Sequence, residues 1–554
     1  MIGFVFFYYT TIIIFLKRMI NDFIIGKIAA MVISGKKDFS EKRLSKIKRA
    51  ASKLYGAPCP TNIDLLRAYR RLAAQGKIKR SETIEKALVT KEIRTESGVA
   101  VVAILTKPYP CPGKCAYCPD EKDMPKSYLS NEPAVMRAVL TRFNPYEQVK
   151  ARLQSLETTG HKTDKIELIV MGGTWSYLKK RYQDWYIKEC FRAANEFGKK
   201  KGIYKELDLK AQQKKNEKAG KRIVGLTLET RPDYIDEKEL LNMRALGATR
   251  VELGVQSIYD DVLKKNRRGH GVKETVRATR LLKEAGFKIN YHMMPELPGS
   301  SPERDEAMFT ELFKNPDFQP DMIKIYPCVV VKGTLIYRWL KAGKYKTYSD
   351  EERLAMLARV KKNLPYYVRV TRLIRDIPST SIIAGNKITN LRQELERIGV
   401  REGWKCKCIR CREIRSGAQV EEKELRLVRE DYAASGGKEI FLTFEDKRRK
   451  QLYSLLRLRI NSEESGKNNF MKELRGAALI REVHTYGKLV PMKTRDAKSP
   501  QHIGLGKRLL LEAERIAREE YGAKKIAVIS GVGVRDYYRK NGYRLEESYM
   551  VKNL

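Results

Sequence analysis

Residues 108–120 read PYPCPGKCAYCPD and place Cys111, Cys115 and Cys118 in C-x3-C-x2-C spacing. The segment follows an apolar run, residues 99–107, that is typical of a β-strand. Thiolates are the ligands of iron–sulfur clusters, and three of them leave one iron of a cubane without a protein ligand. Zinc sites more often show paired C-x2-C units. The spacing therefore favours a [4Fe–4S] cluster over zinc at these cysteines.

Outward from this segment, short apolar runs alternate with longer amphipathic stretches between about residues 91 and 350. Strands separated by helices predict βαβ units and a parallel sheet, here long enough to curl into a full or partial α/β barrel. The segment 196–220 is rich in Lys and poor in apolar residues, so we expect a surface helix or an insertion there. The predicted strands are 99–107, 165–173, 222–230, 249–257, 288–296 and 322–330.

The cysteine segment resembles the radical S-adenosylmethionine (SAM) superfamily. The motif of that superfamily carries an aromatic residue just before the last cysteine, and Tyr117 matches it. The resemblance implies a partial (β/α) barrel in which the open iron chelates the amino and carboxylate groups of SAM. Electron transfer into the sulfonium then breaks a C–S bond and releases a 5′-deoxyadenosyl radical.

Polar and glycine residues at predicted strand ends fit the same resemblance. Gly172, Gly173 and Thr174 resemble the Gly-Gly-Glu motif that holds the SAM amino group, although Thr174 stands where Glu is usual. Glu229 and Gln256 end later strands, where barrel sites gather their polar residues. An ordinary polar residue at a strand end is an equally good interpretation of each of these two.

A second cysteine cluster lies in GWKCKCIRCRE, residues 403–413, with Cys406, Cys408 and Cys411 in C-x-C-x2-C spacing. Three or four thiolates suit a structural zinc ion that ties two domains together, and a second iron–sulfur cluster is the alternative. Cys328, a histidine or water could supply the fourth ligand. Six of the nine cysteines fall into the two clusters, an arrangement that indicates metal ligands in a reducing cytosol rather than disulfides.

The C-terminal part has a different pattern, with antiparallel-type strands at 440–445 and 452–460 and a helix at 506–521. It predicts a second α/β domain of roughly 140 residues. A glycine-rich turn opens the helix, and the N–H groups and dipole of a helix amino end suit a pyrophosphate. The turn resembles the Q/R-x-x-G-x-G/A signature of GNAT-type acetyltransferases. This resemblance implies that acetyl-CoA is bound by Gln501, His502, Ile503, Gly504, Leu505, Gly506 and Lys507.

The segment GVGVRDYYRKNGY, residues 531–543, resembles the GNAT stretch in which a Tyr protonates the departing thiolate of coenzyme A. Tyr538 matches that position. Its neighbour Tyr537 is a further candidate for contact with acetyl-CoA, although core packing of a short helix explains Tyr537 more readily than Tyr538. The resemblance further implies that Gly531 and Gly533 handle acetyl-CoA.

The charge balance indicates a polyanionic partner. Lys and Arg number 111 against 67 acidic residues, a net charge of +44, and such self-repulsion is usually tolerated for nucleic acid. A Lys-rich proteome with solvated faces is the alternative. The composition is 42% hydrophobic, which excludes a disordered protein.

The first residues raise a separate question. Residues 1–16 are almost wholly apolar, shorter than a bilayer span, and lack the leader and cleavage site of a signal peptide. Because MINDFIIGKIAA from Met19 reads as an ordinary start, we expect residues 1–18 to precede the true initiator. A membrane anchor is the minor alternative. Residues 19–90 have a helical pattern. Between Lys17 and Thr90 there are 18 basic and six acidic residues, which indicates an RNA-binding region or, nearly as well, a helical cap with a solvated face.

The combination of these motifs resembles the catalytic subunit of Elongator in its single-subunit archaeal or prokaryotic form. Segments that carry the likeness include NEPAVMRA, RFNPYEQ, ETRPDYI, RVELGVQS, HMMPELPGS, IREVHTYG and GVRDYYRKNGY. That family modifies carbon 5 of the wobble uridine of tRNA. The resemblance implies that the radical removes hydrogen from the methyl of acetyl-CoA, that the carbon radical adds to uridine, and that hydrolysis of the thioester leaves a carboxymethyl group. Glu482 and His484, in a strand facing the CoA loop, are candidates for activating that water, although a strand histidine is more often structural.

The resulting prediction is a cytoplasmic tRNA-modifying enzyme that binds the anticodon stem-loop, SAM, acetyl-CoA and zinc. An electron donor is required, and self-association or accessory subunits are left open. A protein lysine acetyltransferase with a structural iron–sulfur domain is the rival prediction, and a non-catalytic tRNA-binding module is a third. The expected domains are 19–90 (basic, helical), 91–400 (radical SAM), 401–415 (zinc element) and 416–554 (GNAT-type).

Overall fold

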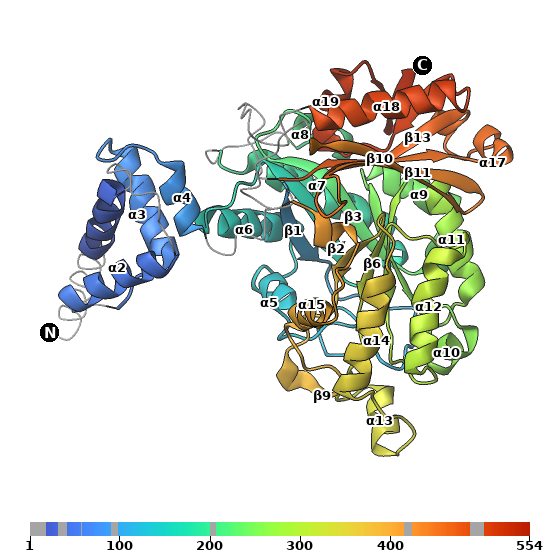
Figure 1. The fold of residues 1–554 in the computed structure, drawn as a ribbon, viewed down its shortest axis with the longest axis horizontal. Coiled ribbons are helices and arrows are strands. Elements are labelled where there is room, and N and C mark those ends of the chain that lie inside the picture. Colours follow the sequence, from blue (N-terminus) through green and yellow to red (C-terminus); the bar gives the residue numbers. More distant parts are fainter. Residues whose placement is uncertain are drawn as a thin grey trace. The chain divides into compact units, whose positions relative to one another are not determined.

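The computed structural model describes residues 18–31, 41–56, 58–89, 98–199, 206–414, 424–487 and 504–554. The chain divides into two compact units, one formed by residues 1–95 with 151–163 and the other by 96–150 with 164–554 (Figure 1). The apolar run 1–17 lies outside the described residues, so the expected upstream start stays a prediction. None of the helices in the described ranges has the length and apolar character that a bilayer crossing requires.

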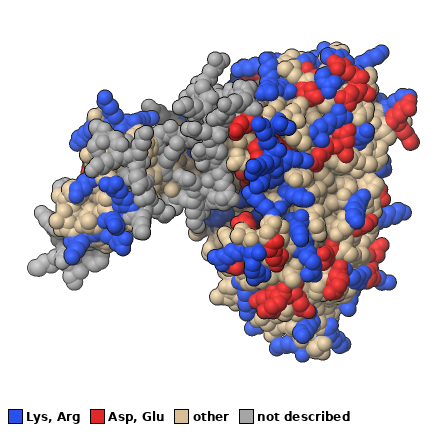
Figure 2. Space-filling model, in the orientation of Figure 1, with Lys and Arg blue, Asp and Glu red and all other residues tan. Residues whose placement is uncertain are grey.

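The first unit is helical. A helix over residues 18–31 is followed by α2 (Glu41–Leu54), α3 (Asn62–Ala74) and α4 (Glu82–Leu88). Apolar side chains spaced three and four residues apart, among them Ile24 and Leu65, form its core. Figure 2 shows Lys and Arg side chains on the visible face of this unit. The helical pattern predicted for 19–90 is confirmed in the described residues, and its role in RNA binding stays a prediction.

The second unit contains a sheet of seven strands whose order follows the chain, with every pairing parallel. Within the described residues its two end strands do not pair with each other, so the sheet is an open half-barrel. All six predicted strands are present, and the sequence did not predict the seventh. The strands are β1 (Ala100–Leu105), β2 (Lys165–Met171), β3 (Arg222–Thr230), β4 (Arg250–Gln256), β5 (Lys288–Met293), β6 (Met322–Ile325) and β8 (Arg369–Arg372).

Burial alternates along β2, as expected for a strand with one face under helices and one face toward the barrel interior. A small separate ribbon pairs β7 (Val330–Val331) with β9 (Ile382–Ala384). The helix α6 (Pro145–Thr158) begins in this unit, and its residues from Ala151 onward belong to the first unit. The other helices of this part are α5 (Pro133–Leu140), α7 (Lys180–Glu196), α8 (Leu209–Asn216), α9 (Glu237–Ala245), α10 (Asp260–Lys265), α11 (Val272–Glu284), α12 (Pro302–Lys314), α13 (Leu335–Lys341), α14 (Asp350–Asn363), α15 (Leu391–Arg401) and α16 (Ile409–Arg412).

Part of the segment 196–220, predicted to be a surface helix or insertion, is buried. Asn216, in α8, is fully buried, and its side-chain nitrogen donates to Asn195 Oδ1 at 2.8 Å. The side-chain oxygen of Asn216 accepts from the backbone N–H of Ile223, at the start of β3, at 2.8 Å. Composition could not predict this burial, because the polar residues of a buried amide network are of the same types as those on a solvent-exposed helix face.

The C-terminal residues form a second seven-stranded sheet in the order β10-β11-β12-β13-β14-β16-β15, in which only the β13–β14 pairing is parallel. This confirms the predicted change of pattern after residue 415. The elements are β10 (Arg426–Ala434), β11 (Gly437–Glu445), β12 (Leu452–Ile460), α17 (Glu463–Lys467), β13 (Ala477–Thr485), α18 (Leu505–Glu519), β14 (Lys525–Val528), α19 (Arg535–Arg539), β15 (Arg544–Glu546) and β16 (Tyr549–Asn553).

The second sheet packs on the amino ends of the parallel strands, within the same compact unit (Figure 1). Arg481 of β13 pairs with Asp321, the residue before β6, at 2.5 Å. Lys288, the first residue of β5, donates to Glu482 at 3.0 Å. The carboxyl ends of the parallel strands are therefore left for a ligand site, as in other α/β barrels.

Candidate active site at the carboxyl ends of the parallel strands

A pocket of about 1060 Å³, part of it open to solvent, lies at the carboxyl ends of β2 to β6. It brings together eight residues that the sequence singled out from four separate segments. These are Cys111, Cys115, Tyr117, Cys118, Gly173, Thr174, Glu229 and Gln256. Gly172 lies directly behind the lining, where a Cβ atom would overlap the hydroxyl of Thr106.

The cysteine loop is held in a form that suits metal binding. The backbone N–H of Gly113 donates to Cys111 Sγ at 3.4 Å, and Arg268 Nη1 donates to Cys115 Sγ at 3.4 Å. A hydrogen bond with Cys118, assisted by the positive charge of Arg268, lowers the pKa of Cys115 to about 4. The thiolate is the form that ligates metals, so these contacts favour the ligating state at Cys115, whereas the hydrogen bond with Cys115 and burial raise the pKa of Cys118.

Two glycines make room for guanidinium groups at the pocket wall. A Cβ atom on Gly254 would lie 2.5 Å from Arg268 Nη2, and one on Gly113 would overlap Arg231. Arg231 is held in place by Asp233, with 2.9 Å between Nη2 and Oδ2. Glycine at these two positions thus places positive charge beside the cysteine loop.

The strand ends supply a ring of polar groups. Glu229 accepts a hydrogen bond from the Tyr128 hydroxyl at 3.2 Å, and its other oxygen lies 3.7 Å from His292 Nδ1. Beneath them, buried Glu252 lies 2.8 Å from His292 Nε2 and pairs with Lys324. Burial opposes the charge on Glu252, but Lys324 and His292 outweigh it and hold the pKa of the carboxyl well below its ordinary value.

Gln256 has an unusual backbone, with a φ of +72° that non-glycine residues rarely adopt. Its Oε1 atom is buried and has no hydrogen-bond partner among the described residues, and the same holds for Arg231 Nη1. Strain and unsatisfied polar atoms at one pocket indicate a place where a polar ligand completes the contacts.

The sequence prediction missed most of the basic lining. Arg268 follows α10, Arg372 is the last residue of the unpredicted β8, and Arg375 follows that strand. His292 and Lys324 occupy inward positions of β5 and β6, so the alternation along each strand was a signal that could have found them. The full basic set is Lys126, Arg231, Arg268, Lys324, Arg372 and Arg375.

The residues present fit an iron–sulfur cluster better than a single ion. Zinc holds thiolates at ~2.3 Å, which draws their sulfur atoms close together. Among the described residues, Cys406, Cys408 and Cys411 are the only three such ligands whose donor atoms all lie within 4.8 Å of one another. The sulfur atoms of Cys111, Cys115 and Cys118 do not all lie within that distance of one another, which is compatible with thiolates that each bind a different iron.

The second cluster is compact and closed. Cys408 is fully buried, and Lys361 Nζ lies 3.5 Å from Cys411 Sγ, where its charge offsets that of the thiolates. The proposed fourth ligand Cys328 does not join them, because it packs in another cluster with Cys115 and Tyr117. No His, Asp or Glu of the described ranges completes the trio either.

The second cluster also connects the two sheets. The Ile409 N–H donates to Val368 O at 2.9 Å, just before β8, and the Ile414 N–H donates to Leu452 O of β12 at 3.1 Å. Arg412 pairs with Glu445 at the end of β11 at 2.8 Å. These contacts suit a structural element.

The expected acetyl-CoA turn is described from Gly504 onward, while Gln501, His502 and Ile503 lie outside the described residues. Gly504 caps α18 with a φ of +78°, and exposed Lys507 lies in the first turn. A Cβ atom on Gly506 would lie 3.3 Å from the Tyr537 hydroxyl and 3.5 Å from Thr485 Oγ1. Gly504 and Lys507 are thus exposed at this end of the helix, Gly506 lies close to Tyr537 and Thr485, and Leu505 is buried in the core.

The tyrosine pair is placed differently from the prediction. Tyr537 is 39% exposed and reaches the amino end of α18. Tyr538 is 6% exposed and packs against the Tyr543 ring at 5.8 Å, and burial raises its pKa. The structure thus gives Tyr538 the packing position expected of Tyr537, and the assignment of Tyr538 as proton donor stays a prediction.

Gly531 and Gly533 have a structural explanation that the sequence did not suggest. A Cβ atom on Gly531 would lie 2.5 Å from the carbonyl carbon of Val224, and one on Gly533 would lie 2.7 Å from Arg222 Cβ. Both glycines therefore let the second sheet approach the backbone of β3, and their contact with acetyl-CoA has no support from this geometry.

The pairing of Glu482 argues against its prediction as a base. Lys288 Nζ and Arg457 Nε each lie 3.0 Å from its carboxylate, and together they hold its pKa at about 2 despite burial. A carboxylate stabilised so strongly as an anion accepts a proton poorly. His484 packs against the Tyr486 ring at 4.4 Å, a structural contact that leaves its predicted role untested.

The comparisons with known proteins agree with this site. The Radical SAM superfamily matches residues 109–311, and the Radical_SAM C-terminal domain matches residues 320–399. A Methanocaldococcus infernus protein named tRNA uridine(34) acetyltransferase is 46% identical over 94% of this chain and 96% of its own length. Elongator complex protein 3 of Bos taurus is 41% identical over 96% of each chain. A solved structure of the archaeal Methanocaldococcus infernus Elp3, lacking its N-terminus, has a TM-score of 0.71 and 45% identity, and covers 83% of this chain and 100% of its own.

Proposed function

This chain belongs to the family of tRNA uridine(34) acetyltransferases and Elongator complex protein 3, and we propose that it installs a carboxymethyl-type group on carbon 5 of the wobble uridine of tRNA. The co-substrates are SAM and acetyl-CoA. Carbon 5 of uridine is not nucleophilic enough for simple acyl transfer, so radical chemistry has a purpose here. The lysine acetyltransferase alternative is not favoured, because the relatives named for uridine match nearly the whole chain.

The observation that carries the proposal is the convergence of three cysteines and six basic side chains in one pocket. A cluster with bound SAM supplies a 5′-deoxyadenosyl radical, which can remove hydrogen from an acetyl methyl group. Cys111, Cys115 and Cys118 would hold the cluster, and Arg268 stabilises the thiolate of Cys115. Gln256, with its buried oxygen unpaired among the described residues, is positioned to accept a hydrogen bond from the bound ligand.

The basic lining supports RNA as the substrate. Six Lys and Arg side chains line the pocket against three acidic ones, so the pocket favours an anionic ligand such as the phosphates around a splayed base. The net charge of +44 extends this preference to the whole chain. We expect tRNA affinity to fall steeply as salt is added, because bound phosphates release counterions.

We assign acetyl-CoA to the amino end of α18. Gly504 and Gly506 expose backbone there, Lys507 adds a positive charge, and the helix dipole favours a pyrophosphate. Zinc is assigned to Cys406, Cys408 and Cys411, where it would fasten the two sheets together. The proposed setting is the reducing cytoplasm, with an electron donor still to be identified.

An anaerobic assay tests the proposal. The reconstituted enzyme receives SAM, a reductant, acetyl-CoA and tRNA, and the products are analysed for 5′-deoxyadenosine and for modified uridine. We expect both products, and omission of acetyl-CoA should abolish the modified uridine. Acetylated lysine in peptides without any 5′-deoxyadenosine would support the lysine acetyltransferase instead.

A further inference from the structure

Three tyrosines form a row of ring contacts, although they come from three separate segments. The ring centroids of Tyr109 and Tyr177 are 6.2 Å apart, and those of Tyr177 and Tyr234 are 5.8 Å apart. Both contacts are edge-to-face, at 74° and 85°. We call these three residues the tyrosine row.

Each member of the row is tied to the pocket through the chain. Tyr109 lies two residues before Cys111, Tyr177 three residues after Thr174, and Tyr234 three residues after Arg231, and all three of these partners line the pocket. The row therefore adjoins three separate parts of the pocket lining along the chain.

The row is not needed for the hydrophobic core. In the segment 174–178, Trp175 and Leu178 are only 3% and 8% exposed and supply the buried contacts. Tyr177, between them, is 42% exposed. An exposed aromatic ring in contact with two others, beside a ligand pocket, indicates a surface that a flat apolar group covers in the complex.

Positive charges flank the row. Lys107, Lys179 and Arg181 are exposed, and the Arg231 guanidinium lies 5.9 Å from the ring centroid of Tyr234. Aromatic rings combined with basic side chains are the usual surface for single-stranded nucleic acid, in which bases stack on rings and phosphates contact cations.

We propose that the tyrosine row is a stacking surface for the unpaired bases of the anticodon loop that flank the wobble uridine. Tyr177 is its central ring, and the flanking Lys and Arg contact the loop phosphates. The row would then hold the loop open while the wobble base enters the pocket. This inference rests on the proposed function, since it requires RNA to be the substrate.

The test uses the full-length enzyme and an anticodon stem-loop RNA with 2-aminopurine next to the wobble position, because stacking on a ring quenches its fluorescence. The variants are Tyr177→Leu, which removes the ring, and Tyr177→Phe, which keeps it. Tyr521→Leu is the matched control, since Tyr521 has a cation, Lys438, 5.6 Å from its ring centroid but follows α18 in the C-terminal part of the chain.

We expect quenching in the wild type, in Tyr177→Phe and in Tyr521→Leu, and its loss in Tyr177→Leu. RNA affinity of Tyr177→Leu should fall about tenfold, in line with the loss of one stacked base, and this fall should exceed any change in the KM for SAM.

Equal quenching and affinity in Tyr177→Leu and wild type would overturn the inference while leaving the proposed function intact. An equal rise in the KM for SAM and for RNA would overturn it as well, since the ring would then serve the adenine of SAM. Failure of the wild type to bind the RNA at all would instead refute the proposed function.

Discussion

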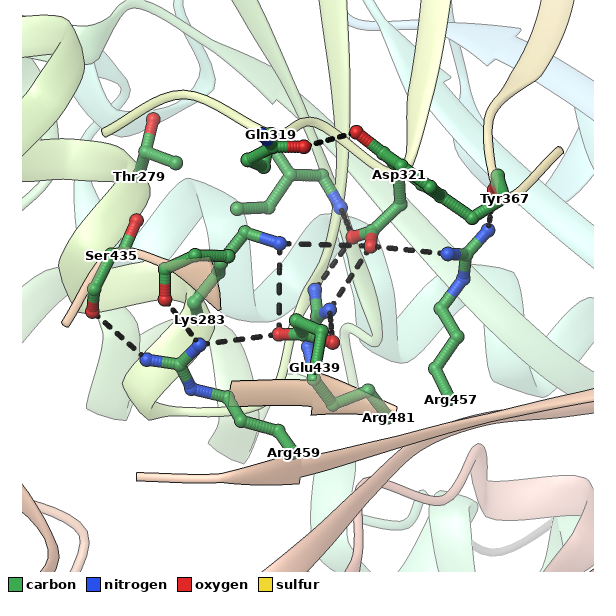
Figure 3. A network of polar contacts seen from close by, with 12 residues as sticks. Thr279, Lys283, Gln319, Asp321, Tyr367, Ser435, Glu439, Arg457, Arg459 and Arg481 are labelled. Carbon is green, nitrogen blue, oxygen red and sulfur yellow. Dashed lines mark hydrogen bonds and ion pairs between the residues drawn. The ribbon is translucent and has the colours of Figure 1, made fainter. Parts of the chain in front are cut away.

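The two ends of the half-barrel use similar residues for opposite purposes. At the amino ends, Lys283, Arg457, Arg459 and Arg481 surround Asp321 and Glu439, and each of these side chains is at most 1% exposed (Figure 3). At the carboxyl ends, basic side chains outnumber acidic ones two to one around an open pocket. One end pairs its charges under a second sheet, and the other presents them to a ligand.

The difference lies in which partner completes the charges. Asp321 accepts from Arg481 at 2.5 and 3.0 Å and from the Ile289 N–H at 2.9 Å, so the protein itself satisfies it. Arg231 Nη1 and Gln256 Oε1 at the other end have no such partner among the described residues. Buried polar groups thus hold the two sheets together at the amino ends of the strands, and they mark a ligand site at the carboxyl ends.

The largest expected effect is at the pocket end. Cys115→Ala removes a thiolate that Arg268 contacts, so the cluster should lose a ligand. We expect iron content to fall and 5′-deoxyadenosine formation to drop to background, with the melting temperature little changed. Cys59→Ser, at an exposed cysteine of the helical unit, is the control and should keep both. Zinc in place of iron at the wild-type site would contradict the prediction.

The second expected effect is at the fastened end. Asp321→Asn keeps the shape of the side chain but leaves Arg481 and its neighbours without their shared anion. Breaking a buried pair in this way costs about 3–5 kcal/mol of unfolding free energy, measurable by urea denaturation. Asp317→Asn, four residues earlier and exposed, should change almost nothing. A small loss at Asp321 would mean that the network does not fasten the sheets.

The sequence predicted the pocket residues at the carboxyl ends of the strands much better than the buried ion pairs at the amino ends. The cysteine spacing and the strand ends named eight pocket residues, because motifs and the two-residue period of a strand are local properties. Gly531 and Gly533 show the limit: their motif resembles a CoA loop, yet the structure uses them to approach β3. Contacts between segments 300 residues apart have no local signal. The buried arginines were missed for the same reason, since a lone Arg in a strand resembles a solvent-facing one.

The third prediction concerns the close approach of Gly531 to the backbone of β3. Gly531 has an ordinary φ of −68°, so Gly531→Ala strains no backbone and its cost comes from packing alone, against Val224. The added methyl group would also lie 3.2 Å from the backbone nitrogen of Gly225. Forcing a methyl group into such a packed contact costs about 1–3 kcal/mol, so thermal unfolding should shift downward. Gly220→Ala, where a Cβ meets nothing within 4 Å, is the control. Unchanged stability of Gly531→Ala would show that the two sheets can separate there.

The smallest expected effect is at Lys283, within the same cluster. Its Nζ lies 3.8 Å from Asp321 and 3.6 Å from Glu439 and has no hydrogen-bond partner among the described residues, while arginines already pair both acids. Lys283→Met should therefore change the unfolding free energy by less than about 1 kcal/mol at neutral pH, since apolar replacements of buried charges are often tolerated. A loss as large as that of Asp321→Asn would show that the lysine is a required partner rather than a surplus cation.

The pH dependence sharpens this last contrast. Burial lowers the pKa of Lys283 to about 8, below the value of about 10.4 for an unfolded chain. Between these pH values the unfolded state binds a proton that the folded state has released, so the stability that Lys283 contributes rises with pH. Urea unfolding of the wild type and of Lys283→Met at about pH 7 and pH 9.5 should therefore show the wild type gaining relative to the variant. If the unfolding free energies of the two proteins changed equally with pH, Lys283 would stay protonated in the folded state with its charge balanced by Asp321 and Glu439. The cluster at the amino ends would then have no cation in excess.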